Sequence, residues 1–194
     1  MKKILIAYPA MMLGGSTTSL LSILYNIDYT KYDVSLSLAF HTGDWMDDIP
    51  KEVKLLEPAY LYQDKKSRYI HRLLSPKFMF TKITAKLMEL RDGNPVHSQQ
   101  YLGMKDVDFY RDIKEEYDVV IAFLEGRTCK YVANHVNAKR KVAWIHVDYK
   151  DSRRCPEYDM QSLSKFDKIV HVSTKCYDSF CEMFPCFKDR SCVI

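Results

Sequence analysis

The sequence predicts an α/β fold in which a mostly parallel sheet carries helices on both faces. Short apolar, β-branched runs alternate with helical patterns, and polar residues follow the runs where parallel strands would end together. The 194-residue chain, 47% of it apolar, is long enough for one sizeable core. We therefore expect a single Rossmann-like domain over residues 1–194, with strands at 3–8, 32–40, 53–56, 118–123, 141–146 and 168–172.

The first predicted helix follows a glycine turn. Leu20, Leu24 and Ile27 recur at helical spacing after the glycine pair at 14–15. With the strands on either side, this helix makes a βαβ unit. At the other end of the chain, residues 190–194 resemble the start of another strand. We therefore expect the chain to stop before a C-terminal domain.

The segment 65–91 is strongly basic, with eight Lys and Arg residues and one acidic residue, Glu89. Apolar stripes on either side of a break at Ser75-Pro76 predict two basic amphipathic helices. Such helices suit an anionic lipid surface. The membrane-facing candidates are Lys65, Lys66, Arg68, Arg72 and Lys77. The alternative is a solvated charged face over ordinary core packing.

The turn signal at 92–95, Asp-Gly-Asn-Pro, predicts the end of the second basic helix. We expect a loop to follow it and to lead into a helix around 106–115. No stretch of the chain approaches the roughly 18 to 20 apolar residues that a membrane span needs.

Composition narrows the class of protein. The formal net charge is only +4, and segment 65–91 lacks the interleaved aromatics or helix-turn-helix of a nucleic-acid-binding module, so we expect no nucleic-acid partner. The six cysteines form no C-x-x-C pair, which gives no indication of a metal site. We interpret them as free thiols in a reducing cytosol, with a secreted disulfide framework as the alternative.

The glycine turn is the first candidate site. Gly14, Gly15 and Ser16 lie between a strand and a helix, where small residues and free backbone N–H groups suit a diphosphate. Neither the dinucleotide G-x-G-x-x-G pattern nor the P-loop pattern occurs there. The alternative is a tight turn in which Ser16 is an ordinary N-cap.

Three later strand ends supply further candidates. His146 and Asp148 follow the strand at 141–146, two residues apart and so roughly on one side of it. Glu125 and Gly126, with Arg127 beside them, follow an earlier strand. Ser173 follows the last, where it also suits a helix N-cap. A buried or rim histidine without function is the alternative for His146, but all of these groups converge on one sheet edge.

Several blocks together resemble the N-terminal domain of bacterial group-one, family-four retaining glycosyltransferases of the GT-B architecture. The blocks are residues 1–15, 24–34, 117–122, 142–148 and 166–173, in the order and spacing of that family. Residues 61–116 match only as a variable, helical, basic region. The chain departs from the family in lacking the C-terminal domain with its paired glutamates and in carrying Ser16-Thr17-Thr18 where a more charged run is common.

The resemblance implies transfer of a sugar from a nucleotide-sugar donor to a saccharide or lipid-linked acceptor, in cell-surface polysaccharide or glycolipid synthesis. It implies no cofactor and no required metal. His146 would contact the transferring sugar, Gly14 and Gly15 the donor phosphates, and this acceptor-side domain would hold the acceptor. The missing C-terminal domain would be its partner, and residues 1–194 alone would fold without catalysing, because only a closed cleft positions the reacting atoms.

The implied location is the cytoplasm, peripheral on the inner face of the cell membrane. The alternative function is a non-catalytic Rossmann-like module that binds a phosphorylated ligand or a partner protein. Such a module would keep the glycine turn but would have no use for His146 at the sheet edge.

Overall fold

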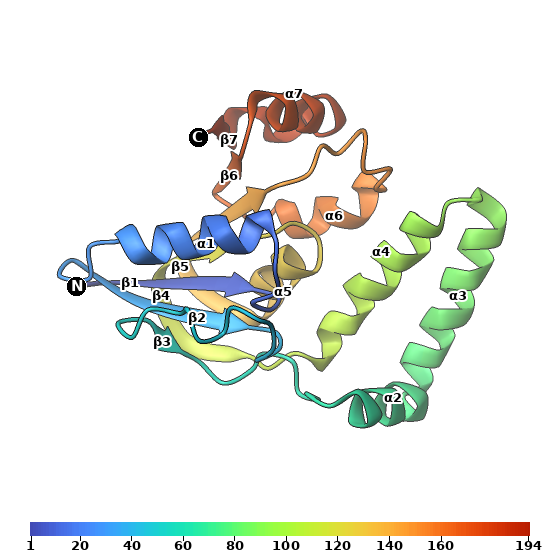
Figure 1. Ribbon diagram of the computed structural model, residues 1–194. Helices are drawn as coiled ribbons and strands as arrows, with labels where there is room; N and C mark the ends of the chain where they lie inside the picture. The colour runs from blue at the N-terminus through green and yellow to red at the C-terminus, as the bar shows by residue number, and fades with distance from the viewer.

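Seven strands, all parallel, form one sheet in the computed structural model, which describes residues 1–194 (Figure 1). The strands are β1 (Lys2–Tyr8), β2 (Tyr32–Leu38), β3 (Lys54–Leu55), β4 (Ile113–Ala122), β5 (Val136–Ile145), β6 (Lys168–His171) and β7 (Ser191–Val193). Their order is β3-β2-β1-β4-β5-β6-β7. The predicted α/β class is confirmed. The order reverses between β1 and β4, where an open sheet leaves a crevice at its carboxyl ends.

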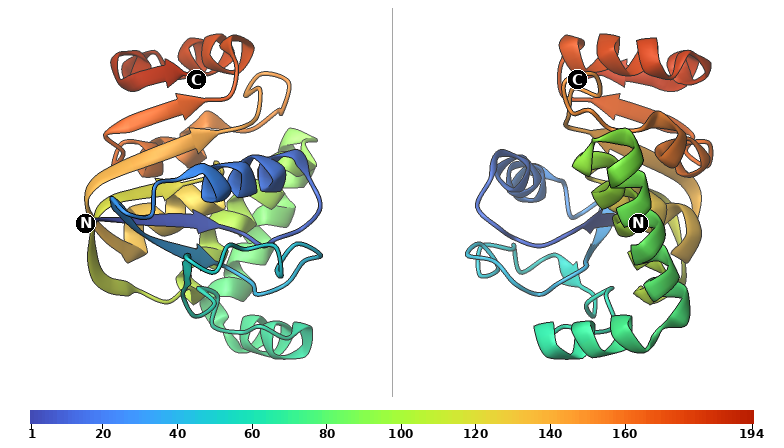
Figure 2. Two further views of the ribbon diagram at one scale, coloured as in Figure 1. Left: turned by 60° about the vertical axis from the view of Figure 1, so that its left-hand side comes forward. Right: turned by 90° about the vertical axis from the view of Figure 1, so that its right-hand side faces the viewer.

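Helices cover both faces of the sheet, as the sequence predicts (Figure 2). They are α1 (Gly15–Asn26), α2 (Lys65–Leu74), α3 (Pro76–Asp92), α4 (Pro95–Asp106), α5 (Arg127–His135), α6 (Pro156–Leu163) and α7 (Thr174–Met183), with 3-10 turns at η1 (Val107–Phe109) and η2 (Pro185–Arg190). One buried cluster packs α1 against the sheet, and a larger one packs α5 and α6 against the opposite face.

Burial on both faces explains the unbroken apolar run of β1. Leu5 and Ala7 belong to the cluster on the α5 side, whereas Ile6 and Tyr8 belong to the cluster on the α1 side. All four side chains are buried. A strand covered on both faces needs apolar residues at every position rather than at alternate ones.

Helices α2, α3 and α4 form an arm beside the carboxyl ends of the strands, toward which the β1 arrow points (Figure 1). The predicted break between the two basic helices is confirmed, because Ser75 caps α3 by accepting the Phe78 N–H. At the far end of α3, Gly93 is left-handed, with φ 63°. Two residues then suffice to reverse the chain into α4.

The apolar stripe of α3 faces solvent. Phe80, Ile83, Leu87 and Leu90, spaced three and four residues apart, are each more than half exposed. The opposite side of the helix, with Phe78 and Ala85, is buried. The apolar stripe of α3 therefore does not pack into the core. Core packing under a solvated charged face was the alternative interpretation of segment 65–91.

The predicted helix around 106–115 is wrong. The helix of this region is α4, which ends at Asp106, and β4 begins at Ile113. The Asn94 side chain accepts the Val96 N–H, and Pro95 occupies the first helical position, so α4 starts immediately after the turn at 92–95. The strand expected at 190–194 is confirmed as β7, which pairs with β6.

Candidate functional site

The carboxyl ends of β1, β2 and β4 surround a cavity of about 290 Å³. Its lining residues are Tyr8, Pro9, Ala39, Phe40, Tyr110, Leu124, Glu125, Arg127, Thr128, Tyr131 and Arg154. Burial raises the pKa of Tyr110 and raises the pKa of Tyr131 to about 12. Both phenols therefore stay protonated at neutral pH and can donate hydrogen bonds to a ligand.

His146 lies directly after β5 and is joined to this cavity through Glu125. The His146 backbone N–H donates to the Glu125 carboxylate at 3.1 Å. The His146 Nε2 atom is buried and has no hydrogen-bond partner. Burial lowers the pKa of His146, partly offset by the charge of Glu125 and by a hydrogen bond to the Phe123 carbonyl. The imidazole is therefore neutral at pH 7, and its Nε2 atom is enclosed by the protein without a hydrogen-bond partner.

A chain of contacts through the rings of Tyr8 and Phe123 links the glycine turn to His146. The Tyr8 hydroxyl hydrogen-bonds the Ser16 hydroxyl at 2.7 Å. The Tyr8 ring centroid is 6.1 Å from that of Phe123, which is 5.1 Å from that of His146. The fold thus brings two separate sequence candidates, the glycine turn and the end of β5, to one region of the sheet edge.

The amino terminus of α1 has no side-chain cap. Gly14 is the N-cap residue, so Ser16 lies inside the helix and is not the ordinary N-cap considered above. A Cβ atom built on Gly14 or Gly15 would meet no heavy atom within 4 Å. Packing within the chain does not require these glycines, and the backbone N–H groups at this helix end are open to a ligand.

Gly126 is required by the chain itself. Its φ of 70° is left-handed, and a Cβ there would lie 2.6 Å from Nη2 of Arg154. The Arg154 guanidinium in turn donates to the buried Asp159 carboxylate at 2.9 Å. Gly126 therefore lets an arginine pass over the start of α5 and line the cavity.

Asp148 and Ser173 are engaged with α7 rather than with His146. The Asp148 carboxylate accepts the Ser179 hydroxyl at 2.6 Å and pairs with Lys175. These contacts hold the pKa of Asp148 well below its usual range, the Ser179 hydrogen bond being the largest cause. Ser173 accepts the Cys176 N–H and caps α7, which matches the structural alternative stated for it.

Some basic residues of α2 line a groove within the arm, whereas others face solvent. Lys65, Arg68 and Arg72 line a groove of about 590 Å³ between the helices of the arm, which Arg127 also lines. Lys66 is exposed and lies outside the groove. At the start of α3, Lys77 pairs with Asp108. Three of the five membrane-facing candidates therefore point into a cavity.

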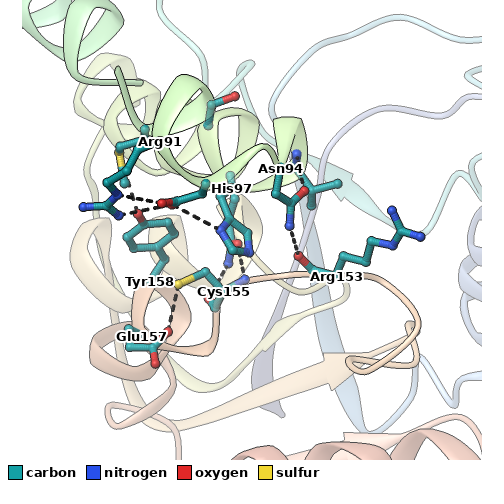
Figure 3. A network of polar contacts seen from close by, with 12 residues as sticks. Arg91, Asn94, His97, Arg153, Cys155, Glu157 and Tyr158 are labelled. Carbon is teal, nitrogen blue, oxygen red and sulfur yellow. Dashed lines mark hydrogen bonds and ion pairs between the residues drawn. The ribbon is translucent and has the colours of Figure 1, made fainter. Parts of the chain in front are cut away.

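A polar network holds the tip of the arm against the loop before α6 (Figure 3). The Asn94 side-chain amide donates to the Arg153 carbonyl at 3.1 Å. Gln100 exchanges two hydrogen bonds with the backbone of Cys155, at 2.8 and 3.0 Å. The Tyr158 hydroxyl contacts the Met88 sulfur at 3.7 Å. These contacts fix the position of the arm relative to the sheet.

Sequence patterns do not reveal three residues of the cavity, namely Tyr110, Tyr131 and Arg154. Tyr110 follows a 3-10 turn, and Arg154 belongs to an irregular loop, so neither has a periodic neighbourhood that marks it. Gly126 is the only sequence signal near these residues, because a glycine after a strand end permits another part of the chain to approach the backbone closely.

All six cysteines are free thiols, and no three His, Cys, Asp or Glu side chains gather as a metal site would need. None of the helices combines the length and the apolar character needed to span a membrane. No protein-family model matches the chain, and no curated protein matches it.

Proposed function

We propose that the chain is the acceptor-side domain of a retaining glycosyltransferase, which transfers a sugar from a nucleotide-sugar donor to a saccharide or lipid-linked acceptor. The observation that carries the proposal is the unpartnered, buried Nε2 atom of His146 at the carboxyl edge of the sheet. A buried polar atom without a partner costs free energy, and a ligand hydroxyl that reached Nε2 on movement of the covering side chains would supply the missing hydrogen bond.

The surrounding groups support a division of roles. The uncapped start of α1, with Gly14 and Gly15, suits the donor diphosphate. Glu125 fixes the backbone of His146, so the imidazole would meet the transferring sugar in a set orientation. The cavity beside Glu125, with its protonated phenols and two arginines, would hold the acceptor. Catalysis in this proposal also needs a donor-binding partner domain to close over the site.

The second candidate is a non-catalytic module that binds a phosphorylated ligand or a partner protein. The uncapped α1 terminus favours it equally, because phosphate binding there needs no reaction. The two candidates differ in what they require of His146, since only the transferase uses this side chain at a reacting centre.

A transfer assay with the product of the complete gene tests the proposal. Radiolabelled nucleotide sugars are offered with a membrane lipid extract, and His146→Ala is compared with His97→Ala, a substitution on α4 outside the cavity. We expect the first variant to lose about 10²-fold in rate, as the loss of one preorganised polar contact does, and the second to keep its rate. Binding of nucleotide sugar without transfer, unaffected by His146→Ala, would instead support the binding module.

The membrane contact of the arm is part of the same proposal. The exposed apolar stripe of α3, flanked by basic residues, fits an anionic lipid surface on which a lipid-linked acceptor resides. Vesicle flotation with and without phosphatidylserine measures the contact. Leu87→Asp should lower recovery roughly tenfold, given the free energy of burying one leucine, whereas Leu61→Asp, outside the arm helices, should not. Equal recovery from both vesicle types contradicts the proposal.

A further inference from the structure

The groove between α2, α3 and α4 is a cavity in which positive charge exceeds negative charge. It measures about 590 Å³. Its charged lining consists of Lys65, Arg68, Arg72, Lys82 and Arg127, with Asp106 as the only acidic residue. A cavity of this volume falls in the range of small-ligand sites.

Asp106 does not balance these charges. Its carboxylate is almost fully buried and accepts hydrogen bonds from the Arg72 guanidinium at 2.6 Å to both oxygens. Arg127 lies 3.5 Å from the same carboxylate. Two arginines thus share one negative charge. The other three cations, Lys65, Arg68 and Lys82, form no ion pair with a carboxylate.

The backbone places these cations around one space rather than spreading them in solvent. Lys65, Arg68 and Arg72 are three and four residues apart, which puts them on one side of α2. On the facing helix α4, Gly103 lies beside Arg127, and a Cβ there would lie 3.3 Å from Arg127 Nη2. Arg127 therefore brings a cation from α5 into the groove lined by the arm.

We propose that this groove binds the phosphate or diphosphate group of an anionic ligand. Guanidinium groups match phosphate oxygens in paired hydrogen bonds, and cations arriving from three helices suit a multiply charged group better than a single carboxylate. Bound phosphate would offset the repulsion among the unpaired cations.

The position of the groove relates it to the sheet edge. Arg127 lines both the groove and the cavity beside Glu125. Tyr69 lines the groove from α2, and more of its surface is exposed than buried. A phosphate held here would lie between the cavity beside Glu125 and the exposed ring of Tyr69. Identifying that ligand as a lipid-linked acceptor rests on the proposed function, whereas the anion site itself does not.

Two double variants test the groove. Arg68→Ala with Lys82→Ala removes two unpaired cations from it, and Lys86→Ala with Lys105→Ala removes two cations of α3 and α4 that lie outside it. Both lower the net charge equally. Inorganic pyrophosphate is titrated calorimetrically into each protein, and in a second arm phosphatidylcholine vesicles with and without phosphatidic acid are floated. Thermal unfolding confirms that each variant is folded.

We expect the groove variant to bind pyrophosphate at least about tenfold more weakly than the wild type, as the loss of charge-assisted hydrogen bonds does. The matched variant should stay within about twofold. Groove-dependent binding to phosphatidic acid vesicles alone also supports the site and identifies a lipid headgroup as the source of the phosphate. Equal losses in the two variants, or no groove-dependent binding in either arm, overturn the proposal. Neither arm measures sugar transfer, so failure of the proposed function would be seen separately.

Discussion

We predict that His171 makes the stability of the fold dependent on pH. It lies at the end of β6, fully buried, and neither ring nitrogen has a hydrogen-bond partner. Its ring is 4.7 Å from that of Phe180 and 5.6 Å from that of Tyr177, centroid to centroid. Burial lowers the pKa of His171 from 6.5 to about 4. The folded protein therefore holds this imidazole neutral over a range in which the unfolded chain protonates it.

The sign and magnitude follow by linkage. Below pH 6.5 the imidazole is protonated in the unfolded state but remains neutral in the folded state. The free energy of unfolding therefore decreases as pH falls toward 4. A shift of this size corresponds to about 3 kcal/mol when complete, of which about 2 kcal/mol develops between pH 7 and pH 5. His171→Leu removes this contribution and also removes two unpaired buried nitrogen atoms.

Urea unfolding at pH 7 and pH 5 measures the effect in both proteins. Carboxylates that titrate in the same range contribute equally to each and cancel in the comparison. We expect the wild type to lose about 2 kcal/mol more than His171→Leu over this interval. If the two proteins lose stability in parallel, to within about 0.5 kcal/mol, the assignment of the pH dependence to His171 is refuted.

Two further substitutions test the contributions of Asp106 and Gly126 to the stability of the fold. Asp106→Asn leaves Arg72 without its carboxylate and should lower the free energy of unfolding by about 3 kcal/mol, the low end for a buried pair because Arg72 reaches solvent; a urea midpoint like that of the wild type would contradict this. Gly126→Ala forces a side chain into a left-handed conformation against Arg154 and should cost about 1–3 kcal/mol. Gly14→Ala, which meets no neighbouring atom, is its control; equal unfolding midpoints for the two alanine variants would show that Gly126 is unstrained.

The sheet was predictable because each strand carries its own signal. Within the predicted runs, residues 4–8 and 142–145 are apolar at every position, as strands covered on both faces must be. Helix α4 gives no such signal, since Gln100 and Asp106 are among its buried residues and their partners, Asp159 and Tyr60, come from distant parts of the chain. A polar residue buried by a distant partner leaves no local pattern.

The candidate site likewise has a part that could be predicted from the sequence and a part that could not. His146 and Glu125 could be named because strand ends are identifiable from sequence, and parallel strands bring their ends together. The direction of the basic side chains could not be predicted, because Lys65 and Lys66 have equivalent local sequence but different surroundings. Which side of α2 faces α4 depends on how the arm folds back, and the local helical pattern does not determine this.

The two ends of the arm meet in an isolated antiparallel bridge between Tyr60 and Tyr110. The backbone N–H of Leu61 donates to the Phe109 carbonyl at 3.0 Å beside it. The chain between Tyr60 and Tyr110 is thus a loop whose two ends are held together at the sheet. Lengthening or shortening such a loop changes the entropy of closing it only slightly. A change in the length or sequence of the arm between Tyr60 and Tyr110 would therefore leave the register of the sheet strands unaltered.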